Sequence, residues 1–108
     1  MFVRIPVPNI EIIGDSDIHV KAGSTVSIKC VITQSLEEPA YIFWYHNDRR
    51  VLDYDHREKN INTERLNQDT TLGTLTIHSA TSEDAGNYTC SPSNLESASV
   101  LLHVLNGK

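Results

Sequence analysis

The 108-residue sequence predicts an all-β sandwich of two packed antiparallel sheets. Short runs of alternating apolar and polar residues recur along the chain, and this alternation is typical of strands that bury one face. Gly, Pro and Asn-Asp turn signals separate the runs at intervals of roughly ten residues, as in β-sandwiches. The third observation is a pair of cysteines, Cys30 and Cys90, that lie far apart in the chain.

The first half of the chain supplies the clearest alternation. In the run 25–33, Val26, Ile28 and Cys30 fall on one face, whereas Ser27 falls on the other. The same criterion, with turn signals between the runs, places the other strands of this half near 10–13, near 18–21, at 40–46 and near 51–54.

The second half continues the pattern. Leu75 and Ile77 alternate with threonines, and Val100 and Leu102 alternate with Ser99 and its neighbours. The expected strands of this half are 60–65, 73–79, 86–91 and 98–105. No window of useful length has the 3.6-residue period of a helix, and only 81–85 suits a single helical turn.

Composition limits the possible functions. Lys and Arg number 9 and Asp and Glu number 14, so the formal net charge is −5, which disfavours nucleic acid as a partner. No apolar run reaches the roughly 20 residues that span a bilayer, and the start of the chain lacks the apolar region of a secretory signal. We expect one domain over 1–108, with its core at about 9–106 and linker edges at both ends.

The cysteine count alone leaves two interpretations. Two thiolates do not complete a four-ligand zinc site, and the C-x-x-C redox motif is absent. Cys30 and Cys90 are therefore either two free buried thiols or one disulfide. A bridge that closes a loop of about 60 residues would stabilise the fold by roughly 4 kcal/mol and would indicate an oxidising compartment.

The residues around the cysteines favour the disulfide. Trp44 follows Cys30 by 14 positions and offers a large apolar body to pack against a bridge between two sheets. Tyr88 should point inward like Cys90, and its hydroxyl is expected to bond to upstream backbone. Tyr88 and Cys90 belong to the motif Asp84-x-Gly86-x-Tyr88-x-Cys90.

The motif also predicts the turn that precedes its tyrosine. Gly86 permits a tight backbone at the start of the strand. Asp84 is expected to accept hydrogen bonds within the turn or to pair with a basic side chain, for which Arg65 is the candidate.

Together these residues resemble an immunoglobulin domain, and the segment Cys90-Ser91-Pro92-Ser93-Asn94 is similar to that of the I-set or C2-like variety. The resemblance implies an immunoglobulin-like β-sandwich (I-set/C2-like) with two packed antiparallel sheets and one inter-sheet disulfide between Cys30 and Cys90. It also implies that Trp44, Tyr88, Asp84 and Gly86 are structural residues of the core and its turn.

A narrower resemblance covers most of the chain. The segments that carry it are Ser24-Thr25-Val26, Tyr41-Ile42-Phe43-Trp44-Tyr45-His46-Asn47, Asp53-Tyr54-Asp55, Tyr88-Thr89-Cys90-Ser91-Pro92-Ser93-Asn94, Ala98-Ser99-Val100 and His103-Val104-Leu105-Asn106-Gly107. They resemble the second immunoglobulin domain of the defective proboscis extension response (Dpr) family, two-domain neuronal surface proteins that include the nematode two-Ig (zwei-Ig) proteins. The sequence departs from the family pattern at 55–60, where a Gly-rich stretch and a shorter strand are usual.

This resemblance implies an extracellular, cell-surface role in neuronal recognition and adhesion at synapses. Members of the family pair with Dpr-interacting proteins, which are also immunoglobulin-superfamily proteins, through their first domain. A chain that resembles the second domain is therefore expected to act mainly as a membrane-proximal spacer, with a membrane anchor outside this chain. Neither a cofactor nor a small-molecule substrate is expected.

Two alternatives of a different class remain. Tyr41, Phe43 and Tyr45 should point outward together with Thr89, Ser91, Leu101 and His103. They share the C-F-G face of the immunoglobulin fold, formed by the expected strands 40–46, 86–91 and 98–105, and this face suits a direct protein contact or a homophilic contact. The same pattern also suits cross-strand pairing within a sheet. The remaining alternative is a generic structural immunoglobulin domain of a secreted protein.

Further motifs point to modification rather than to catalysis. Asn87-Tyr88-Thr89 is the only N-glycosylation sequon, and Asn87 should face solvent because it alternates with the inward Tyr88. The acidic segments 15–17 and 53–56 lack the ligand number of a metal site, so no metal is expected. Known catalytic motifs are absent, so the sequence does not predict an enzyme.

Overall fold

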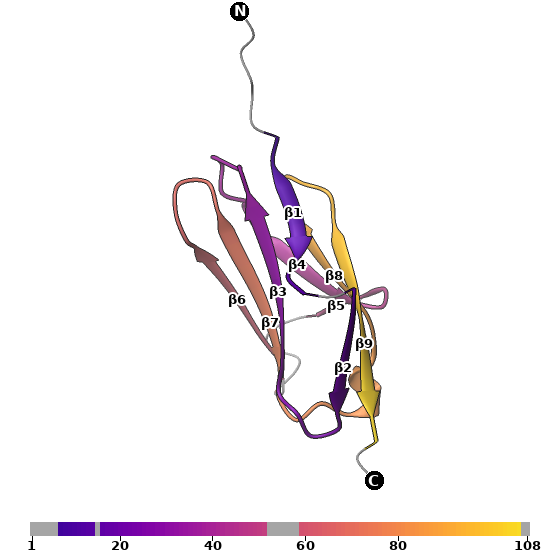
Figure 1. Ribbon diagram of the computed structural model, residues 1–108. Coiled ribbons are helices and arrows are strands. Elements are labelled where there is room, and N and C mark those ends of the chain that lie inside the picture. Colours follow the sequence, from indigo (N-terminus) through magenta and orange to yellow (C-terminus); the bar gives the residue numbers. More distant parts are fainter. Residues whose placement is uncertain (1–6, 15, 52–58, 107–108) are drawn as a thin grey trace, which may run out of the picture.

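The computed structural model describes residues 7–14, 16–51 and 59–106. Within these residues, two sheets pack face to face (Figure 1). One sheet has the strand order β1-β3-β7-β6 and the other has the order β2-β9-β8-β4-β5. The elements are β1 Asn9–Ile12, β2 Asp17–Lys21, β3 Val26–Thr33, β4 Ile42–His46, β5 Arg49–Val51, β6 Lys59–Arg65, β7 Thr71–Ile77, the 3₁₀ helix η1 Ser82–Asp84, β8 Gly86–Pro92 and β9 Ala98–Leu105. The predicted fold class is confirmed.

One strand pair departs from the expected antiparallel arrangement. The chain passes from the first sheet to the second between β1 and β2, and both strands run in the same direction (Figure 1). β1 is antiparallel to β3, but β2 reaches β9 running the same way and pairs with it in parallel. Gly14 in this crossing has φ +103°, a conformation that costs a residue with a Cβ more than it costs glycine. The second sheet is therefore mixed.

Most expected strands shift by one or two residues at their ends. β7 starts at Thr71 rather than at residue 73 and stops at Ile77, and Ser79 then takes φ 53°, outside the extended region. β5 occupies Arg49–Val51, whereas the sequence suggested 51–54; residues 52–54 lie outside the described part of the chain. The expected helical turn is η1.

The core lies between the inward faces of the two sheets. Its buried apolar side chains come from alternate positions, as the burial of β3 and β7 shows most clearly. The fully buried large residues are Trp44, Tyr88, Ile28, Ile32, Leu75, Ile77 and Leu102. Among the described residues, no helix is long and apolar enough to cross a membrane.

Candidate functional site

A disulfide joins the two sheets at the centre of the core. Cys30 on β3 and Cys90 on β8 are bonded, with their Cα atoms 6.4 Å apart, and both are fully buried. Trp44 on β4 lies opposite Cys90 in the sheet register and is also fully buried. Its indole N–H has no hydrogen-bond partner among the described residues, so the ring serves as apolar filling.

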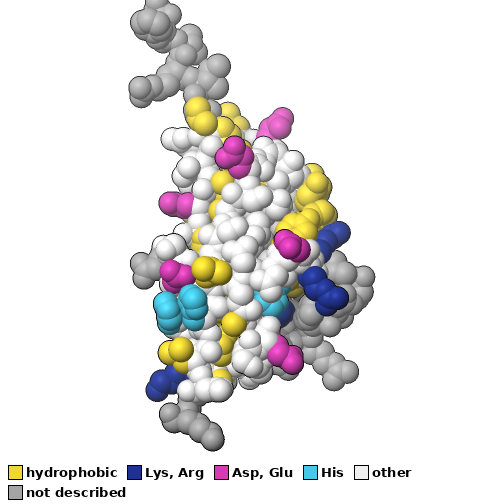
Figure 2. Space-filling model, turned by 90° about the vertical axis from the view of Figure 1, so that its right-hand side faces the viewer, with side chains coloured by type: hydrophobic (Ala, Val, Ile, Leu, Met, Phe, Trp, Pro, Cys, Tyr) yellow, Lys and Arg dark blue, Asp and Glu magenta, His cyan; other side chains and the backbone are white. Residues whose placement is uncertain are grey.

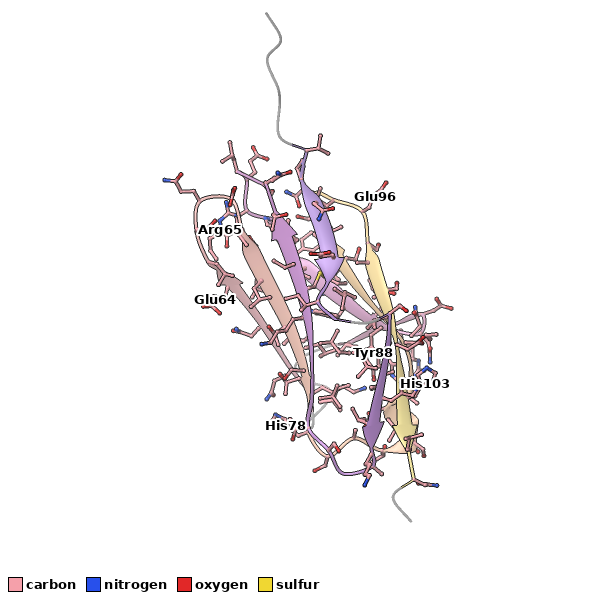
Figure 3. The ribbon with its side chains drawn as sticks, viewed as in Figure 1. Glu64, Arg65, His78, Tyr88, Glu96 and His103 are labelled. Atoms are coloured by element: carbon pink, nitrogen blue, oxygen red, sulfur yellow. A yellow bond between two sulfur atoms is a disulfide. The ribbon has the colours of Figure 1, made fainter. Side chains whose placement is uncertain are left out.

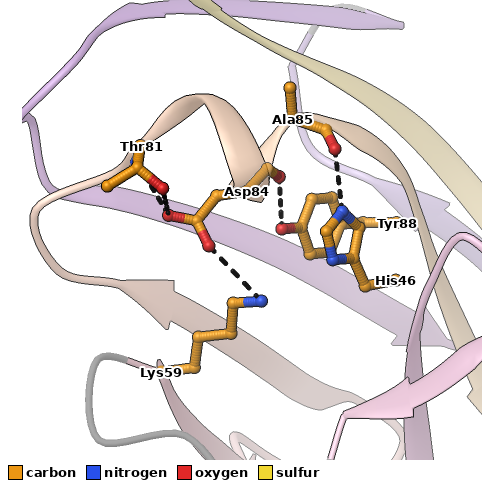
Figure 4. A network of polar contacts seen from close by, with 6 residues as sticks. All are labelled: His46, Lys59, Thr81, Asp84, Ala85 and Tyr88. Carbon is orange, nitrogen blue, oxygen red and sulfur yellow. Dashed lines mark hydrogen bonds and ion pairs between the residues drawn. The ribbon is translucent and has the colours of Figure 1, made fainter.

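The turn between β7 and β8 carries a polar network (Figure 4). The hydroxyl of Tyr88 donates to the backbone carbonyl of Asp84, which is the upstream bond that the sequence motif predicts. One carboxylate oxygen of Asp84 accepts from the backbone N–H of Thr81 at 2.8 Å, so it caps η1. Burial, and then the nearby Asp84 charge, raise the pKa of Tyr88 well above its ordinary value. Tyr88 therefore stays a hydrogen-bond donor across the neutral range.

The cation that reaches Asp84 is Lys59, and not Arg65 as the sequence suggested. The Nζ of Lys59 lies 3.5 Å from Oδ1 of Asp84, and the two side chains are only 7% and 17% exposed. The same ammonium lies 5.8 Å from the centre of the Tyr88 ring. A charge so far out of water needs such partners, so Lys59 and Asp84 depend on each other.

Arg65 lies at the other end of the same strand, distant from Tyr88 (Figure 3). Antiparallel pairing places Arg65 opposite Thr71 and Lys59 opposite Ile77, next to the turn that contains Asp84. Arg65 donates instead to Thr71 Oγ1 at 2.8 Å and to three backbone carbonyls, those of Ser35, Leu36 and Gln68. The guanidinium thus ties together two loops at this end of the sandwich.

The sequence motif did not reveal the role of His46 and Asn47 beside the turn. The His46 ring stacks on the Tyr88 ring, with centroids 4.4 Å apart, and its Nε2 donates to the carbonyl of Ala85 at 2.8 Å. Asn47 binds Asn87 twice, since it donates its backbone N–H and accepts with Oδ1. Gly86 has φ +132°, and a Cβ there would lie 2.7 Å from Asn47 Oδ1. Gly86 therefore supplies both conformation and space.

The outer face of the second sheet holds an aromatic–arginine patch, formed by Tyr41, Phe43 and Arg50. The Tyr41 and Phe43 rings stack with centroids 4.1 Å apart, and the Arg50 guanidinium lies 3.6 Å from the centre of the Phe43 ring. Tyr41 keeps 49% of its surface exposed. Tyr45, the third expected aromatic residue of this strand, lies opposite Arg50 and is partly buried.

The other end of this face holds a histidine–leucine patch, formed by His19, Leu101 and His103. The two imidazoles stack with centroids 4.4 Å apart, and His103 Nε2 lies 3.1 Å from Oδ1 of Asp17. Leu101 is 44% exposed. Figure 2 shows hydrophobic side chains beside Lys or Arg side chains on the right and a group of histidine side chains at the left.

The expected single contact face is therefore divided in two. β8 runs between β4 and β9, and its outward residues are polar, namely Asn87, Thr89 and Ser91. The immunoglobulin resemblance already placed strand 86–91 between 40–46 and 98–105 on this face, but it did not show that the side chains gather into two separate stacks.

The expectation that the acidic segments 15–17 and 53–56 bind no metal stays a prediction for most of their residues. Asp15 and the segment 53–56 lie outside the described residues. Within the described part of the chain, no group of three or more His, Cys, Asp or Glu side chains is arranged to hold a metal ion.

Comparison with known proteins supports this description. The chain is 28% identical to a Dpr2 chain of two immunoglobulin domains whose crystal structure is a complex with DIP-Theta; the TM-score is 0.82 and the match covers 97% of this chain and 52% of that chain. The chain thus spans about half the length of this neighbour.

More distant structures share the fold alone. A chain of the complex between the first immunoglobulin domains of Dpr1 and DIP-eta has 16% identity and a TM-score of 0.72, and the match covers 92% of this chain and 97% of that chain. The structure of the eight N-terminal domains of Down syndrome cell adhesion molecule gives 19% identity and a TM-score of 0.71. The match covers 96% of this chain and 13% of that chain.

No curated protein matches the chain. The model of the immunoglobulin domain family matches residues 8–94, which is most of the sequence. This chain resembles the recognition domains of cell-surface proteins and belongs to the immunoglobulin domain family.

Proposed function

We propose that the chain is an extracellular spacer domain of a Dpr-like neuronal recognition protein. In this role it holds a preceding immunoglobulin domain, which binds partners of the Dpr-interacting type, at a distance from a membrane anchor outside this chain. The 28% identity with half of a two-domain Dpr2 chain supports the proposal, because that match covers 97% of the sequence.

The position of the chain ends is the observation that carries the spacer role. β1 begins at one end of the sandwich and β9 finishes at the opposite end (Figure 1). The eight residues of β9 alone extend about 26 Å at a rise of roughly 3.3 Å per residue. Whatever precedes Asn9 is thus separated from whatever follows Leu105 by the length of the sandwich.

The buried Cys30–Cys90 bridge supports the extracellular part of the proposal. Disulfides of this kind form and persist in oxidising compartments such as the secretory pathway. The bridge also stabilises the small domain, since it closes a loop of about 60 residues.

A binding measurement on the longer natural protein tests the spacer role. The double variant Tyr41→Ala/Arg50→Ala removes the aromatic–arginine patch, and Leu101→Ala is the matched control on the other half of the face. If the domain is a spacer, surface plasmon resonance gives the same affinity for a Dpr-interacting protein in all versions. A loss of more than about tenfold in the double variant would reject the spacer role in favour of direct contact.

The aromatic–arginine patch favours that direct contact as a second candidate function. Tyr, Phe and Arg are enriched at the energetic centres of protein interfaces, and the stack holds these three side chains in place before any partner arrives. A homophilic version predicts dimers at high concentration in sedimentation analysis, and those dimers should disappear in the double variant. A monomer at all concentrations removes the homophilic version.

A further inference from the structure

We propose that Asn87 carries an N-linked glycan and that this glycan covers the histidine–leucine patch while it leaves the aromatic–arginine patch open. The inference rests on the extracellular part of the proposed function, because the modification occurs only in the secretory pathway. Its ligand class is an oligosaccharide joined through N-acetylglucosamine.

The structure directs the Asn87 side chain outward from a rigid backbone. Its neighbour Tyr88 is fully buried, so the alternation of β8 turns Asn87 to the outer face. Both backbone polar groups of Asn87 bond to Asn47, since the N–H of Asn87 donates to Asn47 Oδ1 at 3.0 Å and its carbonyl accepts from the Asn47 N–H at 2.7 Å. A sugar attached here has a fixed base.

The sequon residues already contact each other. The Nδ2 of Asn87 donates to Thr89 Oγ1 at 3.2 Å, and Thr89 Oγ1 lies 2.8 Å from the hydroxyl of Ser99. A glycosylated amide keeps one N–H, so this bond persists after modification.

The sheet register decides which patch the sugar covers. Asn87 lies directly opposite Leu101 on β9, and on the far side of Leu101 lies Asp17, followed along its strand by His19. Phe43 lies opposite Ser91, which is four residues from Asn87 along β8, or about 13 Å. The first sugars therefore lie over the histidine–leucine patch, at a distance from the aromatic–arginine patch.

The chemistry of attachment is a glycosyl transfer from a polyprenyl-diphosphate-linked oligosaccharide. The bond between Asn87 Nδ2 and sugar C1 forms, the bond between C1 and the diphosphate oxygen breaks, and its electron pair leaves with the diphosphate. One amide proton passes to a base of the transferase.

The experiment uses the chain secreted from eukaryotic cells. Peptide N-glycosidase should lower its mass and convert residue 87 to aspartate. Asn87→Gln and Thr89→Ala should abolish the glycan, whereas Thr89→Ser, which preserves the sequon, should retain it. Where a variant does not fold, enzymatic removal of the glycan from the unchanged protein replaces it.

Chemical labelling tests the coverage. Diethylpyrocarbonate should modify His19 and His103 less in the glycosylated protein than in the deglycosylated one, while nitration of Tyr41 should be equal in both. Equal histidine labelling would overturn the proposed coverage. A secreted chain with an intact disulfide and no glycan would overturn the glycan and leave the proposed function standing. A chain with two free thiols and no glycan would reject the extracellular role itself.

Discussion

The two ends of β6 each place a cation in a buried or partly buried position, but the two cations have different kinds of partner. Each end places a cation against the end of the sandwich, with Lys59 at the first residue of the strand and Arg65 at the last. Lys59 has one carboxylate, Asp84, and the face of the Tyr88 ring. Arg65 has no carboxylate within ion-pair distance among the described residues, and donates to one hydroxyl and three carbonyls.

The difference follows from the two charged groups. An ammonium is a compact charge that needs a counter-charge when it leaves water, whereas a guanidinium spreads its charge over a planar set of donors. The Lys59 end therefore depends on electrostatic balance between a buried ammonium and a partly buried carboxylate. The Arg65 end depends on geometry, since several neutral acceptors must converge on one side chain.

Of the substitutions that test this difference, removal of Asp84 should lower the free energy of unfolding most. Asp84→Ala leaves Lys59 buried without its counter-charge and removes the cap of η1, so we expect a loss of about 3–5 kcal/mol in the free energy of unfolding. Urea denaturation measures it. Lys59→Met is the control, because it removes the buried ammonium while the partly exposed Asp84 keeps its hydrogen bond from Thr81. A larger loss for Lys59→Met than for Asp84→Ala would contradict this account of the end.

A substitution at Gly86, the glycine beside this network, should give the next largest loss of stability. Gly86→Ala adds a Cβ in a left-handed conformation and 2.7 Å from Asn47 Oδ1, so we expect a loss of about 2–3 kcal/mol. Gly23→Ala is a matched control, since Gly23 also has positive φ but meets no atom within 4 Å. Its loss should be about 1 kcal/mol. Equal losses would show that the contact with Asn47 adds nothing.

Substitution of Arg65 should lower the stability less than substitution of Asp84. Arg65→Met leaves several carbonyls without a donor, and because those loops are partly exposed, water replaces some of the bonds; we expect a loss of about 1–3 kcal/mol. Arg65→Lys should resemble Arg65→Met, because one ammonium does not reproduce the fork of donors. Hydrogen exchange at the Ser35 amide, which donates to Asp69, reports the loosening directly. Full retention of stability in Arg65→Lys would argue for charge over geometry.

The smallest effect concerns the Tyr88 hydroxyl and has a pH signature. Tyr88→Phe should cost about 1 kcal/mol near neutral pH through the lost bond to Asp84. The pKa of Tyr88 is raised in the folded state, so the unfolded chain loses this proton first as pH rises above about 10, and the native protein is then destabilised. The stability gap between the two proteins should narrow above that pH. Denaturation midpoints from pH 8 to 11 test it, and a constant gap would contradict it.

Several features followed from local pattern alone. The alternation in β3 and β9 and the motif that ends at Cys90 predicted the sandwich and the tyrosine bond, because each depends on residues close in sequence or on a strand's two faces. The disulfide joins residues 60 positions apart, and it was predicted from the joint pattern of Cys30, Trp44 and the Cys90 motif. The prediction that Arg65 pairs with Asp84 was wrong, although the sequence pattern already argued against it. Antiparallel pairing of the expected strands 60–65 and 73–79 already carries Arg65 away from the turn that follows the second of them.

The amino-acid sequence by itself determined the fold class, the buried bridge with Trp44 beside it, and the outward position of Asn87. Only the tertiary structure decided that Lys59 meets Asp84, that β2 runs parallel to β9, and that the outer face holds two separate side-chain stacks. The physical reason is the same in each case. Periodicity specifies which face a side chain occupies, but strand order and register specify its neighbours, and these depend on contacts between segments far apart in the chain.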